Sequence, residues 1–360
     1  MTSHNVTDEP YRGAIGDMRV FQHPGFEALR RLISGEFPGV PPSRLIGSRA
    51  TDVGLGTVSY SMPISRWLED SHGLIEAGIF ALFADAPLAT ALWTGLPAGR
   101  VSTTSEINMS FVRPATKGTT HLIGRAETIH LGRQVGLSSI RITDQTGRLL
   151  THGTTKCLIT DVPVDPDADY PPPDTGPSDP PDPYLREDPP PDMYWTSDEI
   201  SELAPIELMR LAMKTDRRFP VWHLMGYEPV SVAPGALVAR IPSSPWFSNG
   251  GPAVYGGVLA WLADHALGGA VYSTLGVGDL FAPLDLNVRY TRPALIDSGD
   301  LTATSQIRHS GSRLRVSSCD ITNAEGKTVA MATSSALVVP GGARALIDGR
   351  APDEIVGARE

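Results

Sequence analysis

The stretch NGGPAVYGGVLAWLADHALGGAVY, which runs from Asn249 to Tyr272, contains the feature that decides the fold. Its second half predicts a helix that is apolar on nearly every side, and such a helix is normally buried. Asp264 nevertheless lies in the middle of this helix. A carboxylate is costly to bury without a partner, so Asp264 needs a structural or a chemical reason to be there.

The composition indicates a globular protein large enough for two ordinary domains. The chain has 360 residues, 41% of them hydrophobic, and a net charge of −10. No apolar run approaches the roughly 18–20 residues that span a bilayer, and the N-terminus lacks the pattern of a signal peptide. The two cysteines, Cys157 and Cys319, cannot form a metal site by themselves. We therefore expect a cytoplasmic protein without a metal, and the acidic balance argues against a nucleic-acid partner.

Two copies of one unit lie on either side of a proline-rich segment. In residues 161–193, 12 of 33 residues are proline, which predicts a semi-extended linker. A shift of 179 positions aligns residues 29–158 with the second copy without a gap, and about a quarter of the positions are identical. The matched pairs include Trp67 with Trp246, Gly78 with Gly257, Asp85 with Asp264, and Asn108 with Asn287. A long period with only two copies indicates a duplicated domain.

The repeat divides the chain into five predicted segments. They are an N-terminal arm (1–22), a first repeat (23–160), the linker (161–193), a second repeat (194–340) and a C-terminal tail (341–360). Both ends of the chain are expected to be loose.

Each copy predicts the same order of elements. The predicted elements are a short helix (26–34; 205–213), a strand (56–64; 235–243), the long apolar helix (79–93; 258–272) and three β-rich segments (105–115, 120–144 and 147–161; 284–294, 299–323 and 326–340). Alternating β-branched and polar residues favour antiparallel strands, with hairpin turns at 144–147 and 323–326. A helix that is apolar all round should be wrapped by such a sheet.

This order of elements resembles the hotdog fold, and in particular the PaaI-like acyl-CoA thioesterases. That family has an Asn, then His-Gly-Gly six residues later, and an acid nine residues beyond the His. The second copy has Asn249, then Tyr255 followed by Gly256 and Gly257, then Asp264 at the same spacings, with Tyr255 in place of the His. The resemblance implies an α+β double hotdog. In it, two tandem repeats each wrap an antiparallel sheet around a long central helix, so that one chain supplies both halves of the usual dimer.

The resemblance also implies two composite sites, because in this family the acid and the Gly-Gly loop of one site come from opposite halves. The first composite site combines Asp85 with Asn249, Tyr255, Gly256 and Gly257. The second composite site combines Asp264 with Asp70, Glu76, Ala77 and Gly78. The family tends to carry a Ser or Thr on the strand after the acid's helix, and this position is Thr104 in the first copy but Pro283 in the second.

We expect the first composite site to be the working one, because the second has lost the Asn, one Gly and the hydroxyl group. The second site also gathers three acidic residues, which would repel a developing oxyanion. Asp264 remains the alternative catalytic acid, since the sequence signature around it is the better one.

The activity implied by the resemblance is hydrolysis of a fatty or aromatic acyl-CoA in lipid metabolism. Asp85 would activate water as a general base or attack the carbonyl directly. The Gly256 N–H would stabilise the oxyanion, and Asn249 would orient the water or the carbonyl. Coenzyme A enters only as part of the substrate, and no other cofactor is expected. We also expect the double hotdogs to assemble into a homo-oligomer.

Several residues are candidates for binding the substrate. Tyr255 and Gly257 would contact it at the loop. Trp67, Trp246 and Trp261 could line an acyl tunnel, although core packing is the more ordinary role for tryptophan. The candidates for the CoA phosphates are Arg113 and Arg292, together with Arg133 and Arg313.

Other interpretations stay open. A non-catalytic acyl-CoA-binding protein is compatible with Tyr255 and the eroded first copy. An enoyl-CoA hydratase-type lyase would require an Asp–His pair about five residues apart, whereas His265 is adjacent to Asp264 and is expected to face away from the site. Asn249 could simply organise a turn, and Gly256 and Gly257 could simply allow close helix packing.

Overall fold

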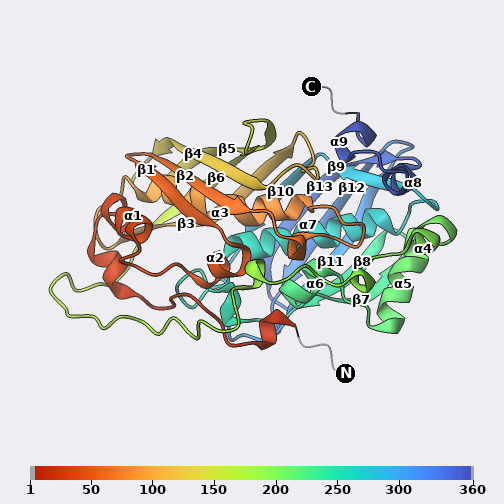
Figure 1. Cartoon of the computed structure of the whole chain (residues 1–360). Helices are drawn as coiled ribbons and strands as arrows, with labels where there is room; N and C mark the ends of the chain where they lie inside the picture. The colour runs from red at the N-terminus through yellow and green to blue at the C-terminus, as the bar shows by residue number, and fades with distance from the viewer. Residues whose placement is uncertain (1–4, 358–360) are drawn as a thin grey trace.

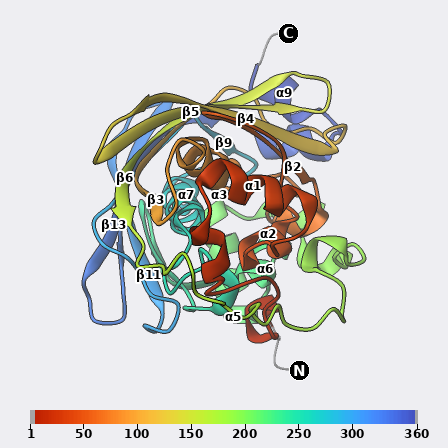
Figure 2. The same cartoon turned by 90° about the vertical axis from the view of Figure 1, so that its left-hand side faces the viewer.

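Two long helices lie side by side at the centre of the molecule, inside one curved sheet (Figures 1 and 2). The computed structural model describes residues 5–357. The central helices are α3 (Ala77–Trp93) and α7 (Gly256–Tyr272), each beginning two residues before its predicted start. Most residues on all sides of both helices are buried, which is the reason the sheet wraps around them.

The sheet contains all the strands of both repeats. The first repeat contributes β1 (Arg49–Gly54), β2 (Thr57–Pro63), β3 (Arg100–Phe111), β4 (His121–Leu131), β5 (Val135–Asp144) and β6 (Leu149–Asp161). The second contributes β7 (Glu228–Ala233), β8 (Ala236–Ile241), β9 (Leu280–Pro283), β10 (Asp285–Tyr290), β11 (Leu301–Ser310), β12 (Leu314–Thr322) and β13 (Thr328–Val339). The order across the sheet is β1-β2-β4-β5-β6-β3-β10-β13-β12-β11-β8-β7, with β9 beside β13.

The two repeats meet where β3 pairs with β10. These strands are antiparallel, and Asn108 lies opposite Asn287, which is the same position of the other repeat. From this junction the order of equivalent strands is the same in both directions. The protein is therefore a pseudo-symmetric double hotdog, and the predicted fold class is confirmed.

Shorter helices surround this centre. They are α1 (Gly25–Ser34), α2 (Pro41–Ile46), α4 (Ser197–Glu202), α5 (Pro205–Thr215), α6 (Pro220–Met225), α8 (Gly342–Ile347) and α9 (Pro352–Ile355). The predicted hairpin turns are also present, since Gly147 N–H donates to Asp144 O and Gly326 N–H donates to Asn323 O. Among the described residues, no helix is both long and apolar enough to cross a membrane.

The prediction of loose ends was wrong for the described parts of both termini. Val6 is 1% exposed, and the indole of Trp246 donates a hydrogen bond to the carbonyl of Glu9. The linker helps to hold this arm, because Arg186 forms an ion pair with Glu9 at 2.6 Å. At the other end, α8 packs against β9 and α9 (Figure 1), and Asp353 of α9 contacts Arg148 of the first repeat. Composition alone did not reveal these contacts because they join segments far apart in the sequence.

Candidate active site

The crossing of α3 and α7 positions both acids. The backbone N–H of Gly257, at the start of α7, donates to Asp85 Oδ2 at 2.8 Å. In the equivalent contact, the backbone N–H of Gly78, at the start of α3, donates to Asp264. Each acid in the middle of one helix therefore meets the N-terminus of the helix from the other repeat, as the resemblance implied.

This close crossing requires glycine. A Cβ atom on Gly256 would lie 2.9 Å from Asp85 Oδ2, and one on Gly257 would lie 2.6 Å from the carbonyl oxygen of Leu82. Gly78 is slightly less restricted, since its Cβ would lie 3.1 Å from Asp264. The glycines are thus needed for packing, whether or not they also contact a substrate.

In the first composite site, Asp85 is 3% exposed, and each of its two carboxylate oxygens accepts a hydrogen bond. Thr104 Oγ1 donates to Asp85 Oδ1 at 2.8 Å, and the Gly257 N–H donates to Asp85 Oδ2. Burial raises the pKa of Asp85 to about 6, although these two hydrogen bonds act in the opposite direction. The predicted set of Asp85, Thr104, Gly256 and Gly257 is brought together.

Three tyrosines pack around the first composite site. Tyr60 is 8% exposed, and Tyr255 and Tyr290 pack against the core. The Tyr290 hydroxyl donates to the carbonyl oxygen of Gly256 at 2.8 Å. Burial and then the nearby Asp85 charge raise the pKa values of Tyr255 and Tyr290. Aromatic rings therefore occupy much of the space beside Asp85.

Two predicted residues lie at the surface. Asn249 is exposed, and its Oδ1 accepts a hydrogen bond from the Gly251 N–H at 2.9 Å, so its side chain organises the turn before α7. Arg292 is also exposed. A contact of either side chain with substrate stays a prediction.

The second composite site contains a turn of the same kind. Asp70 stands at the position equivalent to Asn249, and its Oδ1 accepts hydrogen bonds from the N–H groups of His72 and Leu74. Burial and then the charge of Glu76 raise the pKa of Asp70 to about 7. The same two causes raise the pKa of Asp264, which is 7% exposed, to about 7.

Glu76 is held by a chain of donors that sequence reasoning missed. His265 Nδ1 lies 2.8 Å from Glu76 Oε1, and the Trp261 indole donates to Glu76 Oε2 at 2.9 Å. The Trp222 indole in turn donates to His265 Nε2 at 2.8 Å. The charge of Glu76 is thus partly compensated, which reduces the electrostatic repulsion expected from three neighbouring acids.

His265 also borders the same cavity as Asp264, so the expectation that it faces away from the site was wrong. Neighbouring residues of a helix are separated by about 100° around its axis, and a wide cavity can reach both side chains.

A cavity of about 470 Å³ opens at the second composite site. Its polar end is formed by Asp70, His72, Glu76 and Asp264, and most of its remaining lining is apolar. The volume falls within the roughly 300–1,000 Å³ typical of small-molecule sites. Arg113, whose Nη1 donates to the carbonyl of Leu149, borders the cavity. The tryptophans that line it are Trp195 and Trp222 rather than the predicted Trp67, Trp246 and Trp261.

The side chains around the two composite sites differ in size. At four of the positions equivalent to those near Asp85, the second composite site has a smaller or non-aromatic side chain, whereas the aromatic Phe111 stands at the position of Tyr290. The replacements are Ala239 for Tyr60, Gly268 for Ala89, Gly269 for Thr90 and Glu76 for Tyr255. Gly268, Gly269 and Glu76 line the cavity. These size differences are visible when the two copies are aligned, but the prediction from the sequence used only the polar residues.

Within residues 5–357, no group of three or more His, Cys, Asp or Glu side chains is arranged to hold a metal ion. The acids of the second composite site are instead paired with backbone N–H groups, His265 and Trp261.

Comparisons with known proteins agree with this geometry. The Thioesterase superfamily model matches twice, over residues 72–151 and 251–330. Acyl-coenzyme A thioesterase PaaI from Escherichia coli is 32% identical over 108 residues, which cover 30% of this chain and 74% of that protein. The chain therefore belongs to the Thioesterase superfamily.

Solved structures show the same overall fold. The tesB protein of Mycobacterium avium subspecies paratuberculosis superposes with a TM-score of 0.54 at 14% identity, over 83% of this chain and 98% of that one. A structure described as a putative thioesterase from Novosphingobium aromaticivorans gives a TM-score of 0.51 at 17% identity, over 80% and 97% of the two chains.

Proposed function

We propose that this protein hydrolyses acyl-CoA thioesters at the second composite site, with Asp264 as the general base. The observation that carries the proposal is the cavity of about 470 Å³, which is apolar along most of its wall and has Asp264 at its polar end. An acyl chain fits an apolar cavity, and its thioester would lie beside the acid. The relative named as an acyl-coenzyme A thioesterase supports the same reaction class.

The chemistry follows from the groups at the polar end. The Asp264 carboxylate takes a proton from water, and the water oxygen attacks the thioester carbon. Negative charge develops on the carbonyl oxygen beside the N-terminus of α3, where backbone N–H groups and the helix dipole stabilise it. Collapse of the intermediate expels the CoA thiolate, which takes the proton back from Asp264. The products are a carboxylic acid and free CoA.

The surroundings of Asp264 suit this role. A general base is most effective when its pKa lies near the working pH, and the pKa of Asp264 is raised to about 7. The hydrogen bond from Gly78 favours the ionised form and places the acid at the end of α3. His265 and Trp261 compensate Glu76, so the site does not present three bare charges to the oxyanion.

In this proposal Asp85 has a mainly structural role. It joins β3 to the start of α7 through Thr104 and Gly257, and tyrosines occupy the adjacent space. The sequence favoured the first composite site because of its polar residues. These residues are present, but tyrosine side chains occupy the space beside Asp85.

The test is release of CoA thiol from a panel of short, long and aromatic acyl-CoAs, with binding of the same compounds followed by calorimetry. We expect turnover by the wild type and binding without turnover by Asp264→Asn. If the wild type binds acyl-CoAs but hydrolyses none, the protein is a binding module and the proposal fails. Unchanged turnover in Asp264→Asn would also overturn it.

A further inference from the structure

The two C-terminal helices, α8 and α9, form part of the cavity wall. Leu346 of α8 and Pro352, Ile355 and Val356 at α9 line it. These side chains are aliphatic, so the part of a ligand that reaches them must be apolar. The equivalent residues after the first repeat, 162–178, belong to the linker, so this wall has no counterpart in the first repeat.

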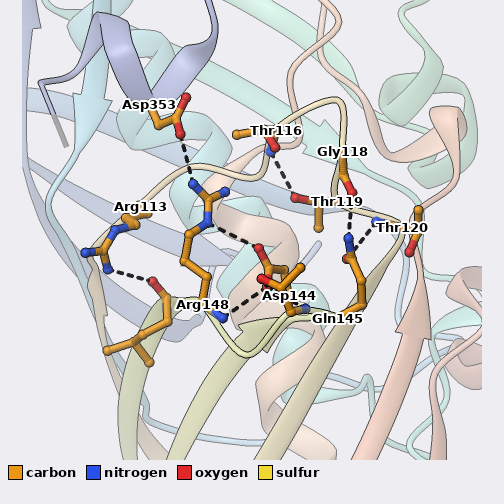
Figure 3. Close-up of polar contacts among 11 residues, drawn as sticks. Arg113, Thr116, Gly118, Thr119, Thr120, Asp144, Gln145, Arg148 and Asp353 are labelled. Carbon is orange, nitrogen blue, oxygen red and sulfur yellow. Dashed lines mark hydrogen bonds and ion pairs between the residues drawn. The ribbon is translucent and has the colours of Figure 1, made fainter. Parts of the chain in front are cut away.

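An ion pair fastens α9 to the other repeat. Arg148 Nη1 lies 2.8 Å from Asp353 Oδ2, while Arg148 Nε contacts Asp144 Oδ2 at 3.2 Å (Figure 3). Asp144 is itself fixed at the β5–β6 turn by hydrogen bonds from Thr146 and the Arg148 backbone. α9 is therefore attached to the β5–β6 hairpin of the first repeat. The two residues that make this contact are 205 positions apart in the sequence.

The turn that holds Arg148 is also connected to the loop after β3. Gln145 accepts from the Thr120 N–H and donates to the carbonyl of Gly118 (Figure 3). That loop begins at residues 112–115, which form another part of the cavity wall. Residues 112–115 and α9, two parts of the cavity wall, are thus joined by one polar network.

We infer that α9 sets the length of the acyl chain, with Ile355 as the specificity-determining residue and Asp353 as the residue that positions it. This inference rests on the proposed function and makes the preferred substrate a linear aliphatic acyl-CoA. Each methylene that enters the cavity should raise affinity about fourfold, and the gain should stop when the chain reaches the α9 wall. The Arg148–Asp353 pair is partly exposed, so losing it should loosen the wall without unfolding the protein.

The experiment measures kcat/KM for saturated acyl-CoAs of increasing length. Ile355→Ala should move the preferred length to longer chains, and Ile355→Phe should move it to shorter ones. Asp353→Asn should broaden the profile toward long chains several-fold, while hydrolysis of the shortest substrates stays within about twofold. Glu354→Gln is the matched control, because it makes the same charge change on an exposed residue of α9.

Binding of non-hydrolysable thioether analogues of the same lengths separates the two proposals. If the wild type hydrolyses nothing, the proposed function fails, but a shifted length profile in binding still supports the α9 wall. Identical length profiles in all variants would overturn the inference. A uniform loss at every length in the Ile355 variants would also overturn it, because that result indicates a general structural role.

Discussion

The two composite sites share one backbone arrangement and differ in what surrounds the acid. Asp85 and Asp264 each accept a hydrogen bond from the start of the opposite central helix. Beside Asp85 the space holds Tyr60, Tyr255 and Tyr290, whereas beside Asp264 there is a cavity. The better-preserved set of polar residues therefore lies in the more tightly packed site. Duplication lets one copy keep the packing and the other open a binding space.

The largest expected effect separates the two acids directly. Asp264→Asn should lower kcat by about 10²–10⁴-fold, because it removes the general base while keeping the shape of the side chain. Asp85→Asn should lower kcat by less than about tenfold, since Asp85 acts through packing. Both changes in kcat are measured by thiol-release assays, and the melting temperatures of the variants show whether they are folded. The opposite ranking would assign catalysis to the first composite site.

The pH dependence sharpens the comparison. An acid that acts as a base works when ionised, so kcat/KM should fall as the pH drops through about 7, the raised pKa of Asp264. Glu76→Gln removes a negative charge that raises the pKa of Asp264. The fall of kcat/KM on the acidic side of the pH profile should therefore move to lower pH. Glu76 is not among the groups that shift the pKa of Asp85. If Asp85 were the general base, the acidic side of the pH profile should therefore stay at the same pH in Glu76→Gln. Glu325→Gln, on the exposed turn before β13, is the charge control.

A smaller effect should come from restoring a first-repeat residue in the second repeat. Gly268→Ala places a Cβ 2.8 Å from Phe281 Cζ, so the Phe281 ring, which lines the cavity, must shift. We expect affinity for long acyl-CoAs to fall about fourfold for each methylene displaced, with short chains unaffected. The reverse change, Ala89→Gly, should cost about 1 kcal/mol of stability and leave affinity unchanged. Equal effects of the two variants on calorimetric binding would argue against an acyl site beside α7.

The smallest effect is expected at Asn249. Asn249→Ala removes the hydrogen bond to Gly251 and should cost about 1 kcal/mol of unfolding free energy, measured by denaturant titration. The value of kcat/KM should stay within about twofold. A tenfold loss of kcat with unchanged stability would instead restore Asn249 to a catalytic role.

Much of the fold was predictable because it depends on patterns that are local or repeated. The apolar helices, the hairpin turns and the duplication all leave signals at fixed spacings. The pairing of Asp85 with Gly257 came from the family resemblance, and the structure shows the contact at 2.8 Å. The support of Glu76 by His265 and Trp261 was not predictable, since it depends on how two helices from different repeats are rotated against each other.

The sequence by itself determined that one unit with a buried, wholly apolar helix is present twice, because a shift of 179 positions aligns the two copies. The double hotdog followed from the resemblance of the motifs in these copies to a known family. It also determined which two acids lie at the centre. Only the tertiary structure decided which acid has a cavity beside it and what closes that cavity. The space beside Asp264 depends on side chains from both repeats and from α8 and α9, and no single stretch of the chain contains that information.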